Sequence, residues 1–219
     1  MQELSLASIQ GRPPVVLFLG AHCDDIEIGC GGTILHLRQV RPDVDLRWVI
    51  LSSSEERRRE ARASAERFLG EEARRRVAVK GFRDGFLPYY GSQVKEFFER
   101  LKCELRPDLI FTHCRDDRHQ DHRLVSELTW NTWRNHLIFE YEIPKYDGDL
   151  GQPNAYVPLR AIDVEHKVKT LLEVYPSRAL HEWFDAETLR GILRLRGVES
   201  NAPERYAEAF YARKLVLAV

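Results

Sequence analysis

The sequence predicts an α/β fold, a Rossmann-like three-layer domain with a mostly parallel central sheet. Over the first two-thirds of the chain, short apolar runs that are typical of buried strands alternate with segments of helical periodicity. That alternation is typical of parallel βαβ units. The length of 219 residues and the 43% hydrophobic content suit one domain with a sizeable core. We therefore expect a single domain over residues 1–219, whose segment from about residue 144 extends it and completes its pocket.

The individual elements follow from local patterns. Helices are predicted where apolar residues recur at helical spacing, and Ser53 with Glu56 has the spacing of a capping box ahead of the second one. Gly70 is suited to end that helix. Beyond residue 144 we expect an extended segment at 156–162, a helix at 164–174 and two less regular segments. The remaining predicted strands are 15–20, 46–51, 77–79, 109–112 and 137–141, and the helices 29–38, 53–69, 92–105 and 121–134.

Composition and charge exclude several classes of partner. The formal net charge is −1, so the chain has no overall attraction to nucleic acid or anionic membranes. The longest apolar stretch, residues 15–21, is far too short to span a bilayer. The first 14 residues lack the basic segment and apolar core of a signal peptide. We expect a cytoplasmic protein that binds no nucleic acid and does not span a membrane.

Two clusters of acidic residues and histidines each follow a predicted strand. The first is Ala21-His22-Cys23-Asp24-Asp25, and the second is Asp117-Arg118-His119-Gln120-Asp121-His122. The carboxyl ends of parallel strands lie at one edge of an open sheet, where such folds bind ligands. We therefore expect the two clusters to form one site.

The residue types in these clusters suit a metal-dependent hydrolase. His22 and Asp25 are spaced i, i+3 and offer ligands for zinc, which keeps three protein ligands and one open position in catalytic sites. The second cluster supplies the third ligand: His119 and His122 bind together, or one binds while the other faces the substrate. The need for a separate proton donor favours the second arrangement.

The carboxylates that do not bind the metal have roles of their own. Asp24 lies beside the ligands and can take a proton from water activated by the metal. Asp121 can bond to one of the histidines and fix its tautomer. A protonated histidine can stabilise an oxyanion and protonate a leaving amine.

At these residues the chain resembles the PIG-L/LmbE-like family of zinc-dependent N-deacetylases. The family motif Ala-His-Pro-Asp-Asp corresponds to residues 21–25, with Cys23 in place of proline, and His-x-Asp-His corresponds to residues 119–122. Weaker agreement covers Thr112-His113, Gly31-Gly32-Thr33, the Arg57-x-x-Glu60 element ahead of Leu69-Gly70, and Asp84-Gly85. Near the C-terminus, residues 175–178 read Tyr-Pro-Ser-Arg where the family has Tyr-x-Ser-Gln.

The resemblance implies a role for each matching residue. One zinc ion per chain would be bound by His22, Asp25 and His122, although other divalent metals also suit such ligands. Asp24 would be the general base. His119 would be the charged partner of the tetrahedral intermediate, oriented by Asp121. The expected substrate contacts are Arg57, Asp84, His113 and Asp117. Asp117 stands where some members carry a tyrosine that serves as an oxyanion donor.

The expected function is hydrolysis of an N-acetyl group on an amino sugar or sugar conjugate. The substrate is a small molecule, and the resemblance alone suggests a homo-oligomer. Two alternatives stay open at this point: an amidase for a larger acyl group or thiol conjugate, and a non-catalytic domain that binds a sugar or nucleotide. A dinucleotide-binding dehydrogenase is disfavoured because residues 29–32 lack the G-x-G-x-x-G spacing.

Overall fold

A central sheet with seven strands runs through residues 12–216, the part of the chain that the computed structural model describes. The strand order is β3-β2-β1-β4-β5-β7-β6. All pairings from β3 to β5 are parallel, and β7 is antiparallel to both of its neighbours. The predicted mostly parallel sheet is therefore confirmed. The strands are β1 (Val15–Gly20), β2 (Asp45–Ser52), β3 (Val77–Phe82), β4 (Leu109–His113), β5 (Leu137–Tyr141), β6 (Ala155–Leu159) and β7 (Tyr206–Ala212).

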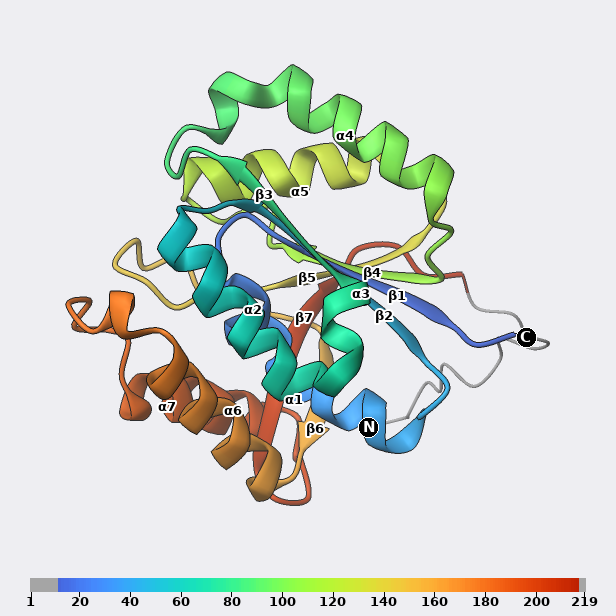
Figure 1. Cartoon of the computed structure of the whole chain (residues 1–219). Helices are drawn as coiled ribbons and strands as arrows, with labels where there is room; N and C mark the ends of the chain where they lie inside the picture. The colour runs from blue at the N-terminus through green and yellow to red at the C-terminus, as the bar shows by residue number, and fades with distance from the viewer. Residues whose placement is uncertain (1–11, 217–219) are drawn as a thin grey trace.

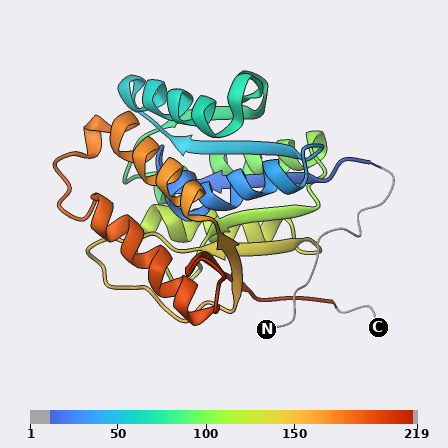
Figure 2. The same cartoon turned by 90° about the horizontal axis from the view of Figure 1, so that it is seen from below.

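Helices cover both faces of the sheet and create the three layers seen in Figure 1. One face carries α4 and α5, and the other carries α1, α2, α6 and α7, which lie in front in Figure 2. Within the described range, no helix is long and apolar enough to cross a membrane. The helices are α1 (Asp25–Val40), α2 (Glu55–Leu69), α3 (Ala73–Arg76), α4 (Gly91–Glu104), α5 (Gln120–Thr132), α6 (Ala161–Val174) and α7 (Ala186–Glu199), with short 3-10 turns η2 (Gly70–Glu72), η3 (Leu87–Tyr90) and η4 (Pro176–Arg178).

Several boundaries differ from the sequence prediction. Helix α1 begins at Asp25 and not at Gly29, so a candidate metal ligand lies in its first turn. Ser54 caps α2 in place of Ser53, and its hydroxyl accepts a hydrogen bond from the N–H of Arg57. The two segments expected to be less regular contain helix α7 and strand β7. Strand β7 pairs with β5 and β6, so the segment beyond residue 144 joins the same sheet as β1–β5.

The topology creates a switch point between β1 and β4. The two strands are parallel neighbours, but the helices that follow them lie on opposite faces of the sheet: α1 on one and α5 on the other. The chain therefore leaves the sheet in opposite directions at this place, and open α/β sheets bind ligands at the carboxyl ends of the strands beside such a switch point. One predicted cluster follows β1 and the other follows β4, so the two clusters flank that switch point.

Glycines allow α1 to lie close to the sheet. A Cβ atom on Gly29 would lie 2.4 Å from the side chain of Tyr141 in β5. A Cβ atom on Gly32 would lie 2.4 Å from the side chain of Leu159 in β6. Any larger residue would push the helix outward. Because α1 starts at Asp25, this contact also determines where the first cluster lies.

A buried ion pair joins α1, α6 and β7. Lys167 donates to Glu208 Oε1 at 2.7 Å and to the carbonyl of Ile28 at 2.6 Å. The Glu208 carboxylate also accepts from the N–H groups of Gly32 and Thr33, each at 2.7 Å. Both charged side chains are at most 3% exposed. Every charge is paired, which offsets the cost of burial, but loss of one partner would leave the other uncompensated.

Replacing Lys167 by methionine should destabilise the fold strongly. The Glu208 charge would stay buried without its partner, so the free energy of unfolding should fall by about 3–5 kcal/mol. Urea denaturation measures the change. Lys169→Met is the matched control, because Lys169 is 72% exposed and lies 3.8 Å from Glu173, and it should cost under about 1 kcal/mol. Equal losses in the two variants would contradict a stabilising role for the buried pair.

Candidate active site

The residues of the two clusters meet at the carboxyl edge of the sheet. The turn between β1 and α1 carries His22, Asp24 and Asp25, and the turn between β4 and α5 leads to His119 and His122. Apart from His119, each of these residues is at most 5% exposed. This placement is consistent with the prediction from the sequence that the two clusters form one site.

Three side chains converge at distances that suit a small cation. The Nδ1 atom of His22 lies 3.1 Å from Nε2 of His122 and 3.3 Å from Oδ2 of Asp25. The Nε2 atom of His122 lies 3.5 Å from Oδ1 of Asp25. Ligands at about 2.1 Å from a tetrahedral zinc ion are about 3.4 Å apart. Asp25 approaches His22 through Oδ2 and His122 through Oδ1, so the three residues expected to bind a metal lie within reach of one such ion.

Carboxylates hold the other nitrogen of each imidazole ring. The Nε2 atom of His22 lies 3.2 Å from Asp121 Oδ2 and 3.1 Å from Asp84 Oδ1. The Nδ1 atom of His122 lies 2.9 Å from Asp117 Oδ2. When these nitrogens donate their N–H to the carboxylates, the lone pairs of the remaining nitrogens face each other. Two lone pairs 3.1 Å apart repel, so a proton or a metal cation must lie between them.

The charges around this position favour a cation. Burial alone would lower the pKa of His22, but Asp25, Asp121 and Asp84 together raise it well above its usual value. Burial would raise the pKa of Asp25, yet the charges of His122, His113 and His22 hold it well below its usual range. The acidic group stays ionised, and the space between the histidines attracts positive charge.

Asp121 has a different neighbour from the one expected. Its carboxylate lies against His22, and it accepts hydrogen bonds from the N–H groups of Gly85 at 2.8 Å and Leu87 at 3.0 Å. Only its backbone N–H contacts His119, at 3.3 Å from Nδ1. In the structure Asp121 thus orients His22 and not His119. Asp121 lies in the first turn of α5, and its carboxylate reaches the turn after β1 and the loop after β3.

Asp117 and His113 also differ from the expectation that they contact substrate. Asp117 is 3% exposed and bonds to His122, and its other partners are the ammonium of Lys145 at 3.0 Å and the N–H of His119 at 2.8 Å. His113 is fully buried, stacks on His122 at 3.9 Å between ring centroids, and places Nε2 3.1 Å from Asp25 Oδ2. Both residues therefore contact the candidate metal ligands His122 and Asp25 and not a substrate: Asp117 bonds to His122, and His113 packs against His122 and Asp25.

His119 caps the N-terminus of α5 and faces the two other rings. Its ring centroid lies 4.9 Å from that of His22 and 4.6 Å from that of His122. Because Nδ1 accepts the N–H of Asp121, the neutral ring carries its proton on Nε2. Burial and the nearby charge of His22 lower the pKa of His119. The residue can therefore donate a hydrogen bond from Nε2.

Other combinations of ligands exist within the same cluster. Three overlapping groups have ligand atoms close enough to hold one cation: His22 with His119 and His122, Asp25 with His113 and His122, and His22 with Asp84 and Asp121. His22 and His122 each belong to two of these groups. The geometry therefore favours a cation near these two rings.

Two arginines bind the remaining carboxylate, that of Asp24. Arg57 donates from Nη2 to Oδ1 at 2.7 Å. Arg178 donates from Nε to Oδ2 at 2.7 Å and from Nη2 to Oδ1 at 2.9 Å. Burial would raise the pKa of Asp24, but the charges of Arg178 and Arg57 outweigh it and lower the pKa. Arg178 was not predicted as a site residue from the sequence. The match of residues 175–178 to a family element was the one signal that could have identified it.

The expected substrate contacts Arg57 and Asp84 bind different residues of the cluster. Arg57 is bonded to Asp24, whereas Asp84 reaches His22 and keeps 69% of its side chain exposed. Hydrogen bonding to His22 lowers the pKa of Asp84 to about 2. Asp84 is thus a charged and accessible group beside the candidate metal ligands.

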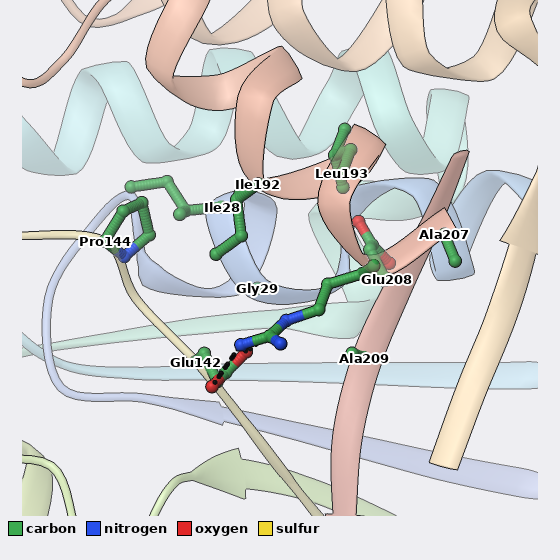
Figure 3. Close-up of a pocket in the computed structure, with 10 residues that line it drawn as sticks. Ile28, Gly29, Glu142, Pro144, Ile192, Leu193, Ala207, Glu208 and Ala209 are labelled. Carbon is green, nitrogen blue, oxygen red and sulfur yellow. Dashed lines mark hydrogen bonds and ion pairs between the residues drawn. The ribbon is translucent and has the colours of Figure 1, made fainter. Parts of the chain in front are cut away.

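A cavity behind α1 is too small to be a substrate site. It lies between α1, α7 and β7 and is crossed by the ion pair between Arg196 and Glu142, 2.9 Å apart (Figure 3). Its volume of about 20 Å³ has room for a single water molecule. The carboxyl edge of the sheet, where the titratable side chains of the two clusters meet, is the better candidate for substrate binding.

Solved structures of three proteins resemble this chain along most of its length. N,N'-diacetylchitobiose deacetylase from Pyrococcus horikoshii is 25% identical, with a TM-score of 0.70 over 90% of this chain and 82% of that chain. The conserved protein TT1542 from Thermus thermophilus is 21% identical, with a TM-score of 0.72 and coverage of 93% and 96%. The fold class predicted from the sequence is that of these structures.

A third structure shows that the fold alone does not determine the reaction. GalB, the 4-carboxy-2-hydroxymuconate hydratase from Pseudomonas putida, is 18% identical, with a TM-score of 0.69 over 94% of this chain and 98% of that chain. A hydratase and a deacetylase thus share this architecture, and the residues of the site must discriminate between them.

A family model also matches this chain at the level of sequence. The model described as PIG-L: GlcNAc-PI de-N-acetylase matches residues 17–133, which include both clusters. The match confirms the resemblance found in the motifs. Because it spans more than half of the sequence, the chain belongs to the PIG-L family.

Proposed function

We propose that this protein is a zinc-dependent hydrolase that removes an N-acetyl group from an amino sugar or sugar conjugate. The single observation that carries the proposal is the convergence of His22 Nδ1, His122 Nε2 and the Asp25 carboxylate within 3.5 Å of one another. Membership of a de-N-acetylase family and similarity to a diacetylchitobiose deacetylase support the reaction type.

The donor set fits zinc in its chemistry as well as its spacing. Two imidazoles and one carboxylate are ligands that zinc accepts in catalytic sites. In each of the two rings, the nitrogen that does not face the ion contacts a carboxylate, as in most metal-binding histidines. A zinc ion bound by His22, Asp25 and His122 would act as a Lewis acid on water and on the acetyl carbonyl.

The other residues of the site would handle the protons. Asp24, kept ionised by its arginines, would take a proton from the attacking water as the oxygen of water bonds to the acetyl carbon. His119 would donate from Nε2 to the oxyanion that forms. The carbon–nitrogen bond then breaks, the nitrogen receives a proton from Asp24 or His119, and acetate and a free amine leave.

The proposal extends to the whole chain. Residues 1–219 would form one domain, and the segment beyond residue 144 would complete the pocket. The contact of Arg178 with Asp24 supports that role, because Arg178 lies between α6 and α7. We also propose that the protein acts in the cytoplasm on a small molecule, as a homo-oligomer, and takes one divalent cation per chain.

A substrate panel tests the function directly. Zinc-loaded protein is incubated with N-acetylated amino sugars that are free, nucleotide-linked or linked to a lipid or inositol, and amine release is measured. We expect release from one class, lost on chelation and restored by zinc. Matched substrates with longer acyl chains should react more slowly. Release of only the longer acyl groups would instead identify an amidase, and silence with zinc bound would favour a binding role.

Asp24→Asn should abolish turnover and leave zinc bound. The amide cannot accept the proton of water, so kcat should fall by about 10²–10⁴-fold while the zinc content per chain is unchanged. Asp43→Asn is the matched control, since Asp43 also binds an arginine through both oxygens but is exposed. Loss of zinc from the Asp24 variant, with activity restored by added zinc, would argue against a base.

Asp117→Asn should weaken metal binding. Without the carboxylate, His122 is no longer held with Nε2 directed to the ion, and the dissociation constant for zinc should rise by about 10–100-fold. Competition with a chromophoric chelator measures it. The neighbouring Asp116→Asn is the control, because the Asp116 side chain is 73% exposed and bonds to Arg213. Unchanged affinity in the Asp117 variant would show that His122 is oriented by other contacts, or is not a ligand.

A further inference from the structure

We propose that Arg178 is a positioning residue, which holds the Asp24 carboxylate in one orientation and leaves a single acceptor position on it. The inference rests on the proposed function, in which Asp24 takes the proton of the attacking water. Arg178 would act through Asp24 and would not touch the reacting atoms itself.

The contacts of Asp24 show how the acceptor positions are used. An ionised carboxylate has about four lone-pair positions, two on each oxygen. Within residues 12–216, Oδ1 accepts from Arg57 and Arg178, and Oδ2 accepts from Arg178 alone. The position left for a proton is therefore on Oδ2.

The fork of Arg178 determines the plane of the carboxylate. Its Nε and Nη2 atoms bond to different oxygens, at 2.7 and 2.9 Å, in the bidentate geometry that fixes both partners. Arg57 reaches Oδ1 only, so by itself it would let the carboxylate rotate. Arg178 is thus the contact that directs the free position of Oδ2.

Arg178 is itself held by a well-anchored turn. Ser177 donates from its N–H and its hydroxyl to the carboxylate of Glu60 in α2, at 3.1 and 2.6 Å. The hydroxyl of Tyr175, which is 1% exposed, contacts the carbonyl of Cys23, the residue before Asp24. The turn at 175–178 is therefore tied to α2 and to the same short segment that carries Asp24.

Three substitutions separate the properties of Arg178. Arg178→Lys keeps the charge without the fork, Arg178→Gln keeps one donor without the charge, and Arg178→Ala removes both. For the alanine variant we expect kcat to fall by about 10–100-fold, with KM changed by less than about threefold and zinc content unchanged. The lysine and glutamine variants should lie between alanine and wild type. Added ethylguanidinium should restore part of the lost kcat of the alanine variant.

The matched control is Arg190→Ala. Arg190 also forms a two-bond fork, with Glu165, at 3.0 and 2.8 Å, but on the exposed surface of α7. Its replacement should leave kcat unchanged. The proposal is overturned if Arg178→Ala keeps kcat within about twofold or raises it, if only KM changes, or if zinc is lost in parallel with activity.

A stability measurement keeps this inference separate from the proposed function. A double-mutant cycle with Asp24→Asn and Arg178→Ala is read from melting temperatures. We expect the double variant to lose less than the sum of the two single losses. If the wild type hydrolyses no amide, the proposed function fails. The positioning role fails separately, when the stability losses of the two single variants are additive or when Arg178→Ala binds zinc less well than wild type. Coupling with zinc affinity unchanged would support the fork in the folded protein.

Discussion

The nitrogen atoms His22 Nδ1 and His122 Nε2 lie 3.1 Å apart because buried carboxylates hold the opposite nitrogen of each ring. This contact is the constraint on which the site depends. It requires a cation or a proton between the rings, and it connects the segments that follow the paired strands β1 and β4. The switch point of the sheet separates the helices that follow the two turns, and the close approach of α1 at Gly29 and Gly32 sets where the first turn of that helix lies.

The cluster concentrates negative charge in a buried place, and the fold compensates each carboxylate separately. Asp24 has two guanidinium groups, Asp117 has the ammonium of Lys145 beside His122, and Asp121 accepts two backbone N–H groups. These partners come from α2, from the turn before α7, from the loop after β5 and from the loop after β3. A charged site of this kind therefore ties together segments that are distant in the sequence, and the segment beyond residue 144 contributes to it directly.

Local patterns in the sequence were sufficient for the parallel part of the sheet and for placing the two clusters at its carboxyl edge. The apolar runs predicted β1, β2, β4 and β5 closely, because buried parallel strands leave a clear signal. Helix α7 and strand β7 were not predicted, since their apolar positions are interleaved with arginine and alanine and depend on tertiary packing. The motifs identified the candidate ligands. They could not show that Asp121 faces His22, that Asp117 supports His122 or that Arg178 binds Asp24, because each contact joins turns whose relative placement depends on the whole sheet.

The same architecture carries a deacetylase and a hydratase, so the position of the cation is the claim that matters most. Anomalous-scattering crystallography of the zinc-loaded protein measures it most directly. We expect one zinc ion bound by His22 Nδ1, His122 Nε2 and the Asp25 carboxylate, with Asp121 and Asp117 bonded to the other nitrogen of each ring. A zinc ion bound instead by His22 Nε2 with Asp84 and Asp121, or by His119 in place of Asp25, would contradict it.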